Sequence, residues 1–167
     1  GVHLGHARIL RTAVSLAHKT GGTACALTFD VHPESVTKNG APPVLTALSE
    51  KKRLMRKIGV DRIFVSRFTD RFRRLPPADF IRKHLMKKRR VAAVVTGFDF
   101  RFGRQRSGDT RLLAEYGRRY GFKVVAMPLL KIGGKTISST SIRKLLLKGR
   151  VEEAALMLGR RYRVSGR

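Results

Sequence analysis

The fold class of this chain of 167 residues is decided by one apolar stretch, Val91-Ala92-Ala93-Val94-Val95-Thr96. Its apolar side chains run continuously instead of alternating with polar ones, which predicts a strand covered on both faces. Strands are also expected at 23–29, 62–66 and 122–127. Because predicted helices separate these strands, we expect an α/β fold in which a parallel sheet carries helices on both faces.

Helical spacing of apolar residues fills the intervals between the strands. The segment from Leu4 to Lys19 repeats apolar residues every three or four positions and stops at Gly21-Gly22. A second helix is expected to begin at a cap formed by Thr46 or Ser49 and to end at Gly59. Further elements are expected in this order: a helix opened by Pro76-Pro77, helices at 109–120, 140–147 and 151–158, and, before the last two, a turn at Gly133-Gly134.

The predicted elements at the two ends of the sequence differ from those of a complete fold of this class. Doubly wound folds place their phosphate-binding loop after a central strand, but this sequence opens directly on a predicted helix. We therefore expect the N-terminal strand to be missing, because it would precede Gly1. Segment 1–159 is expected to form one domain, and segment 160–167 is expected to begin another.

Composition and cysteine content narrow the class of protein. Apolar residues make up 42% of the chain, which is typical of a globular protein and not of a disordered one. Cys25 is the single cysteine, so we expect no disulfide and a reducing compartment, the cytoplasm. No apolar run reaches the length of a membrane span, so no membrane partner is expected.

The chain is strongly basic, with 37 Lys and Arg residues, 11 Asp and Glu residues and a net charge of +26. Such a charge is compatible with binding to nucleic acid. The charge is spread along the whole chain, however, and its densest run, Lys87-Lys88-Arg89-Arg90, has no recognition motif beside it. We therefore expect a solvated basic surface and no nucleic-acid partner, while a basic nucleic-acid-binding protein stays an alternative.

Two segments from opposite ends of the chain have the composition of a phosphate-binding site. They are His3-Leu4-Gly5-His6 and Ile137-Ser138-Ser139-Thr140-Ser141-Ile142-Arg143. Each lies at the start of a predicted helix, where free N–H groups and a partial positive charge favour phosphate oxygens. If the fold brings them together, they would grip a nucleotide triphosphate, and Gly5 would let it approach the backbone. The alternative for His3 and His6 is an ordinary polar cap of the helix.

Four segments together carry a resemblance to a known family. They are Gly1-Val2-His3-Leu4-Gly5-His6, Leu27-Thr28-Phe29-Asp30-Val31-His32-Pro33, Gly97-Phe98-Asp99-Phe100-Arg101-Phe102-Gly103 and the Ser/Thr/Arg segment 137–143. The chain resembles the adenylyltransferase (FAD synthetase) module of the bacterial bifunctional riboflavin kinase/FMN adenylyltransferases, in the nucleotidyltransferase superfamily. It departs from the family pattern at Val31, where Pro is usual, and in lacking a Gly-x-Phe-Asp segment before Gly1. Segment 159–167 is similar to the first residues of the kinase module.

The resemblance implies a fold, a reaction and partners. The fold is a Rossmann-like sheet of the nucleotidyltransferase type, and the reaction joins FMN to ATP and releases FAD and pyrophosphate. Mg²⁺ is the implied cofactor, held mainly by phosphates, and a riboflavin kinase domain is the implied partner in the full-length protein. No metal-binding set of side chains is expected, since no Cys/His spacing supports zinc. Another small-molecule nucleotidyltransferase is the enzymatic alternative.

The resemblance also implies the residues of the site. His3, His6 and Arg143 are expected to be catalytic, because they would stabilise charge on the phosphates without a covalent nucleophile. ATP binding is implied for His3, Gly5, His6, Ser138, Ser139, Thr140 and Arg143, and FMN binding for Asp30, His32, Pro33, Asp99, Phe100 and Arg101. For Asp30 the alternative is a turn or cap residue, and for the aromatic residues around Asp99 it is packing of their own loop.

Overall fold

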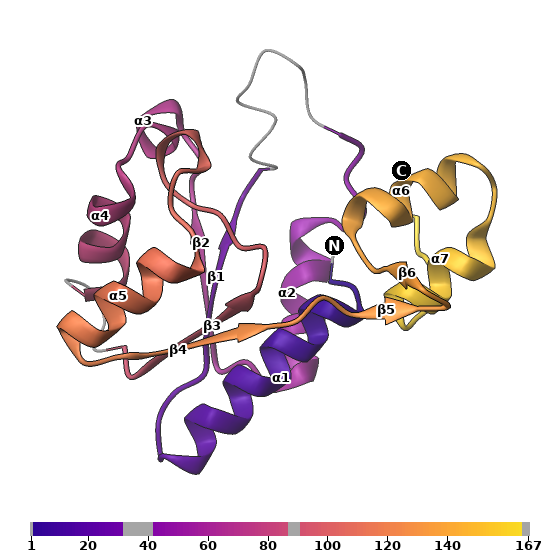
Figure 1. The fold of residues 1–167 in the computed structure, drawn as a ribbon. Coiled ribbons are helices and arrows are strands. Elements are labelled where there is room, and N and C mark those ends of the chain that lie inside the picture. The colour runs from indigo at the N-terminus through magenta and orange to yellow at the C-terminus, as the bar shows by residue number, and fades with distance from the viewer. Residues whose placement is uncertain (1, 32–41, 87–90, 165–167) are drawn as a thin grey trace.

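The computed structural model of this chain describes residues 2–31, 42–86 and 91–164 (Figure 1). The predicted FMN-binding residues His32 and Pro33 and the basic run 87–90 lie outside the described residues. Within them, helices and strands alternate along the chain, and the predicted α/β class with parallel strands is confirmed.

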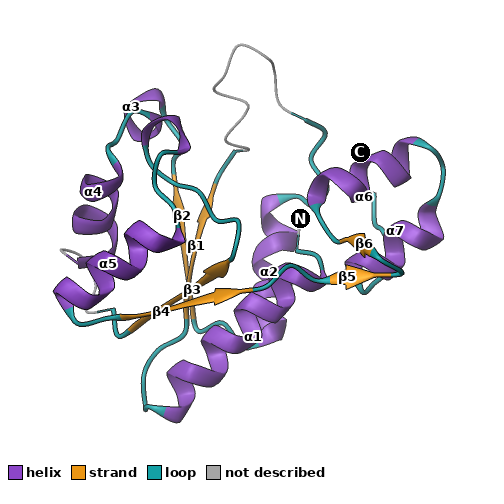
Figure 2. Cartoon of the chain, in the orientation of Figure 1, coloured by secondary structure: helices purple, strands orange, loops and turns teal. Residues whose placement is uncertain are grey.

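The strands form two parallel pairs and one hairpin (Figure 2). They are β1 (Cys25–Phe29), β2 (Arg62–Ser66), β3 (Ala93–Gly97), β4 (Lys123–Met127), β5 (Lys131–Ile132) and β6 (Lys135–Thr136). Strand β1 pairs with β2, and β3 pairs with β4, both in parallel. Among the described residues no strand pairing joins these two pairs, so the expected sheet is observed as two parallel two-stranded units.

The longer helices follow the predicted pattern, whereas the short helix at 70–73 was not predicted. The helices are α1 (Leu4–Lys19), α2 (Leu48–Ile58), α3 (Asp70–Arg73), α4 (Pro77–Phe80), α5 (Thr110–Tyr120), α6 (Ser139–Leu147) and α7 (Val151–Leu158). Helix α4 continues into a π-helical segment, Ile81–Met86, which the sequence did not predict. The predicted cap of α2 is wrong: Ala47 occupies the cap position, and its side chain has no group that could accept a hydrogen bond. Thr46 precedes the cap, is buried and accepts a hydrogen bond from Arg160, and Ser49 lies inside the helix.

Helices cover both faces of the β3–β4 pair. On one face, Val94 and Val124 pack in an apolar cluster with Leu113 of α5. On the other face, α1 packs against β3, and the Ile9 side chain lies 3.7 Å from the position that a Cβ of Gly97 would occupy. Helix α1 also contacts α2 and β1, so it lies at the junction of the two strand pairs.

A separate apolar cluster holds the C-terminal part of the chain together. Ile137, Ile142 and Leu158 are buried in it, and the cluster joins the β5–β6 hairpin to α6 and α7 (Figure 1, right). Leu4 at the start of α1 packs against the same cluster. The start of α1 and the start of α6 are therefore held close to one body of packed side chains. Among the described residues, no helix has both the length and the apolar character that crossing a bilayer requires.

Candidate active site

A cavity of about 280 Å³ lies where the start of α1, the end of β3 and the segment from β4 to α6 converge. The residues around it include parts of the two segments that the sequence suggested for phosphate binding. His3, Gly5 and His6 line it from α1, and Ser138 and Ser139 line it from the start of α6. The fold therefore brings together residues from opposite ends of the chain.

His3 caps α1 and is held in one orientation. Its Nδ1 accepts a hydrogen bond from the His6 backbone N–H at 3.4 Å, so in the neutral ring the proton resides on Nε2. The side chain is only 7% exposed. Burial, followed by the positive charges of His6 and Arg160, lowers the pKa of His3 to about 3. His3 is therefore neutral at pH 7 and offers an N–H donor.

His6 and Gly5 complete the first turn of α1. The His6 side chain is exposed, and its ring centroid lies 3.8 Å from that of His3. A Cβ on Gly5 would lie 3.1 Å from the His3 ring, so the glycine leaves room for the imidazole beside the helix start. A glycine at position 5 therefore has a structural reason, which is room for the His3 ring. This reason is separate from the predicted approach of a nucleotide to the backbone.

The second segment that the sequence predicts for phosphate binding lies at the start of α6. Ser138 caps the helix, and its Oγ accepts a hydrogen bond from the Ser141 N–H at 3.0 Å. Thr140 and Arg143 do not line the cavity. Arg143 instead donates its Nε–H to the carbonyl oxygen of Pro43 at 2.8 Å.

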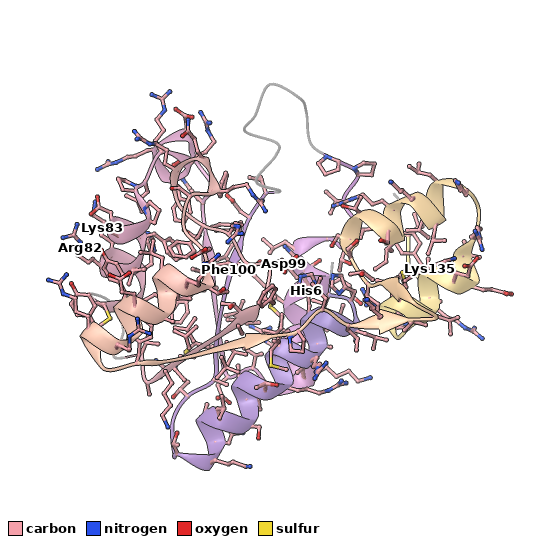
Figure 3. All side chains as sticks on the ribbon, viewed as in Figure 1. His6, Arg82, Lys83, Asp99, Phe100 and Lys135 are labelled. Carbon is pink, nitrogen blue, oxygen red and sulfur yellow. The ribbon has the colours of Figure 1, made fainter. Side chains whose placement is uncertain are left out.

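The residues expected to bind FMN are dispersed. Asp99 lines the same cavity as the histidines, and Figure 3 shows Asp99 and His6 near each other at the centre of the molecule. Phe100 stacks on Phe102 at 5.4 Å between ring centroids and packs against an apolar cluster. Arg101 forms an ion pair with Asp109 at 3.3 Å.

Asp30 organises a turn at the end of β1. Its Oδ1 accepts hydrogen bonds from the backbone N–H groups of Phe68 at 3.0 Å and Val31 at 2.9 Å. The bond from Phe68 is the main reason that the pKa of Asp30 lies below its ordinary range. Asp30 does not line the cavity, and its hydrogen bonds form a turn, while its role in FMN binding stays a prediction.

Several residues of the cavity wall were not predicted. They are Ile9, Gly97, Met127, Pro128, Leu129, Leu130 and Thr136. One signal was available for part of this set: residues 127–130 follow the carboxyl end of a predicted strand, where doubly wound folds bind their ligands. The wall thus combines apolar surface with N–H donors, hydroxyls and one carboxylate. This composition suits a ligand that carries both a flat apolar group and phosphates.

Comparisons with known proteins show which family the chain resembles. Residues 1–141 match the family described as FAD synthetase. The chain is 38% identical over 170 residues to a bifunctional riboflavin kinase/FMN adenylyltransferase of Listeria monocytogenes, covering 99% of this chain and 53% of that protein. It is 36% identical over 168 residues to the protein of the same description from Escherichia coli K12, covering 100% and 54%.

Two further matches are a second relative and a solved structure, of which the structure bears on the fold. A protein described as FAD synthetase from Listeria monocytogenes is 32% identical over 168 residues, covering 99% of this chain and 68% of its own length. A solved structure described as a macrolide-efflux protein from Streptococcus pneumoniae matches with a TM-score of 0.82 and 25% identity, over 96% of this chain and 61% of its own. The chain spans about half the length of the bifunctional relatives.

Proposed function

Because this chain belongs to the FAD synthetase family, we propose that it transfers the AMP group of ATP to FMN, giving FAD and pyrophosphate. The observation that carries the proposal is that His3 and His6 of α1 line the same cavity as Ser138 and Ser139 of α6. Two helix starts facing one cavity supply N–H groups and positive dipole ends to a chain of phosphates.

The chemistry that this site must perform is mostly positioning and charge stabilisation. The FMN phosphate oxygen attacks the α-phosphorus of ATP, and the bond from that phosphorus to the pyrophosphate oxygen breaks. The His3 Nε2–H, which is available because Nδ1 accepts from His6, donates to an oxygen of the α-phosphate. His6 supplies a second donor, and the hydroxyls of Ser138 and Ser139 with the first N–H groups of α6 hold the β- and γ-phosphates.

We propose that Arg143 and Thr140 join the site when ATP binds. Arg143 is held by the Pro43 carbonyl oxygen, which is a neutral acceptor. Charged phosphate oxygens are stronger acceptors for a guanidinium and can take two parallel hydrogen bonds from it. Exchange of the Pro43 carbonyl for pyrophosphate oxygens would bring Arg143 to the leaving group.

Mg²⁺ fits the donor set of this cavity. Asp99 is the carboxylate that lines it, and among the described residues no group of three or more His, Cys, Asp or Glu side chains is arranged to hold a metal. Mg²⁺ is commonly bound through one or two carboxylates together with substrate phosphates. When bound, the ion would neutralise negative charge on the phosphates, with Asp99 as its ligand from this chain.

We assign FMN to the side of the cavity formed by the loop after β3. Asp99 lies in the wall, and Phe100, which is packed on Phe102, fixes the loop that carries it. Arg101 would have to leave Asp109 to contact a phosphate. The relatives' riboflavin kinase part is the proposed partner domain in the full-length protein, and the free thiol of Cys25 supports a cytoplasmic location.

The test is formation of FAD from FMN and Mg·ATP by the purified protein, followed by chromatography of the flavins. FMN should be consumed in equal amounts with FAD formed. Phosphopantetheine, nicotinate mononucleotide and glycerol phosphate serve as alternative acceptors, and transfer of AMP to one of these instead of FMN would contradict the proposal. The basic nucleic-acid-binding alternative predicts association that weakens steeply with salt and survives replacement of His3 and His6.

A further inference from the structure

The segment that follows α7 lies directly over the first turn of α1. Gly159 has φ +68°, and a Cβ there would lie only 2.5 Å from the Leu4 Cδ2 atom. Tyr162 packs against the same apolar cluster as Leu4. Close packing of this kind allows little independent movement of the two segments. The first turn of α1 is therefore supported from outside the cavity by residues 159–162.

Arg160 forms the polar part of this support. Its Nη1 donates to the carbonyl oxygens of Val2 and, at 3.3 Å, Leu158. Its Nη2 donates to the Thr46 Oγ1 at 3.3 Å. One guanidinium thus joins the residue before His3, the end of α7 and the loop before α2. The planar fork of arginine suits this task, because it presents several N–H groups in fixed directions.

The Val2 carbonyl oxygen, which accepts from Arg160, lies next to His3 of the candidate active site. The Val2 carbonyl belongs to the peptide group that enters His3, and Val2 itself is only 5% exposed. Fixing this peptide group restricts the backbone of His3, whose own carbonyl accepts the first hydrogen bond of α1 from Ala7 at 2.9 Å. The direction of the His3 ring depends on that backbone. Arg160 does not itself line the cavity.

We propose that Arg160 is a positioning residue for adenylyl transfer: its fork fixes the Val2–His3 peptide group so that the His3 imidazole faces the reacting phosphate. The inference rests on the proposed function, and it adds a residue that the family match over 1–141 does not include. Burial is the main cause of the low pKa of His3, and the Arg160 charge is the smallest of its causes.

The test compares Arg160→Met and Arg160→Lys with Arg161→Met, a matched control at the neighbouring exposed arginine. Each protein is assayed for FAD formation while the concentrations of FMN and ATP are varied separately. The fraction of folded protein at the assay temperature is taken from thermal unfolding, and each rate is divided by the concentration of folded protein. Misplacement of a catalytic group by about 1 Å can cost on the order of 100-fold in rate. We expect kcat to fall by at least about 10-fold in Arg160→Met, with the KM for FMN nearly unchanged. Arg160→Lys should recover part of the rate, and Arg161→Met should match the wild type.

A second measurement does not depend on turnover. The ¹⁵N resonances of the His3 ring should shift in Arg160→Met and stay unchanged in Arg161→Met. An active wild type whose Arg160→Met variant keeps full kcat per folded molecule and unchanged His3 resonances would overturn the positioning role and leave the proposed function intact. A wild type that forms no FAD would contradict the proposed function, and the His3 resonances would then still decide whether Arg160 orients this ring.

Discussion

At the scale of single residues, His3 and His6 belong to the same short motif but have different environments. His3 is buried, whereas His6 is exposed, and both residues line the same cavity. His6→Ala should therefore lower kcat for FAD formation by about 100-fold or more, the usual cost of removing one charge-stabilising donor. Thermal unfolding should change little, because an exposed side chain is removed. A variant with nearly the wild-type rate would remove His6 from the reaction.

The low pKa of His3 predicts an acid dependence of stability. An ordinary histidine titrates near 6.5, and in the folded protein His3 titrates at about 3. Between these two pH values His3 is protonated in the unfolded chain and neutral in the folded chain. The free energy of unfolding therefore decreases as pH falls below about 6.5. Urea unfolding at pH 7, 6 and 5 should show a steeper loss for the wild type than for His3→Asn, which can still cap the helix. If the free energy of unfolding fell equally with pH in both proteins, the low pKa of His3 would be contradicted.

Replacing Arg143 tests the proposal that this side chain, which lies outside the cavity wall, binds ATP during the reaction. Arg143→Lys keeps the charge but loses the fork that binds two phosphate oxygens, so the KM for ATP should rise and kcat should fall. The matched control is Lys144→Arg, because Lys144 is the exposed neighbour on α6. Unchanged constants in Arg143→Lys would leave the bond to Pro43 as the role of this side chain.

At the scale of elements, the contact between α5 and β4 depends on one small residue. A Cβ on Gly117 would lie 2.5 Å from the backbone oxygen of Phe122, which cannot move without disturbing the start of β4. Gly117→Ala should therefore destabilise the fold by about 1–3 kcal/mol, the usual cost of overpacking. Urea unfolding measures the loss, and Arg118→Ala at an exposed position of the same helix is the control. The KM for ATP should not change, since Gly117 does not line the cavity.

Elements also show where local reasoning succeeds. The bounds of α1 and α7 agree with the predicted helices, because apolar spacing and terminal glycines are local signals. The cap of α2 was mispredicted because Thr46 is used elsewhere, as an acceptor for Arg160. The π-helical segment after α4 gave no local signal, because its sequence has ordinary helical character.

At the scale of the whole molecule, a net charge of +26 in 167 residues implies strong self-repulsion. Salt near physiological ionic strength shortens the screening distance to about 8 Å and should reduce this repulsion. We expect Tm to rise between low salt and about physiological salt. Potassium chloride and potassium glutamate should act alike if screening is the cause, and a Tm that falls with both salts would contradict it.

The sequence by itself determined the longer helices, the main strands, their parallel class and the two segments suited to phosphate, because spacing, β-branching and glycines act within a few residues. It did not predict α3 or the π-helical segment after α4. Only the tertiary structure decided that both segments line one cavity, that Arg143 binds Pro43 and that Asp30 forms a turn. It also decided that Arg160 reaches the Val2 carbonyl across almost the whole length of the chain. Contacts of this kind depend on how distant elements pack, and packing is a property of the assembled core that no local pattern contains.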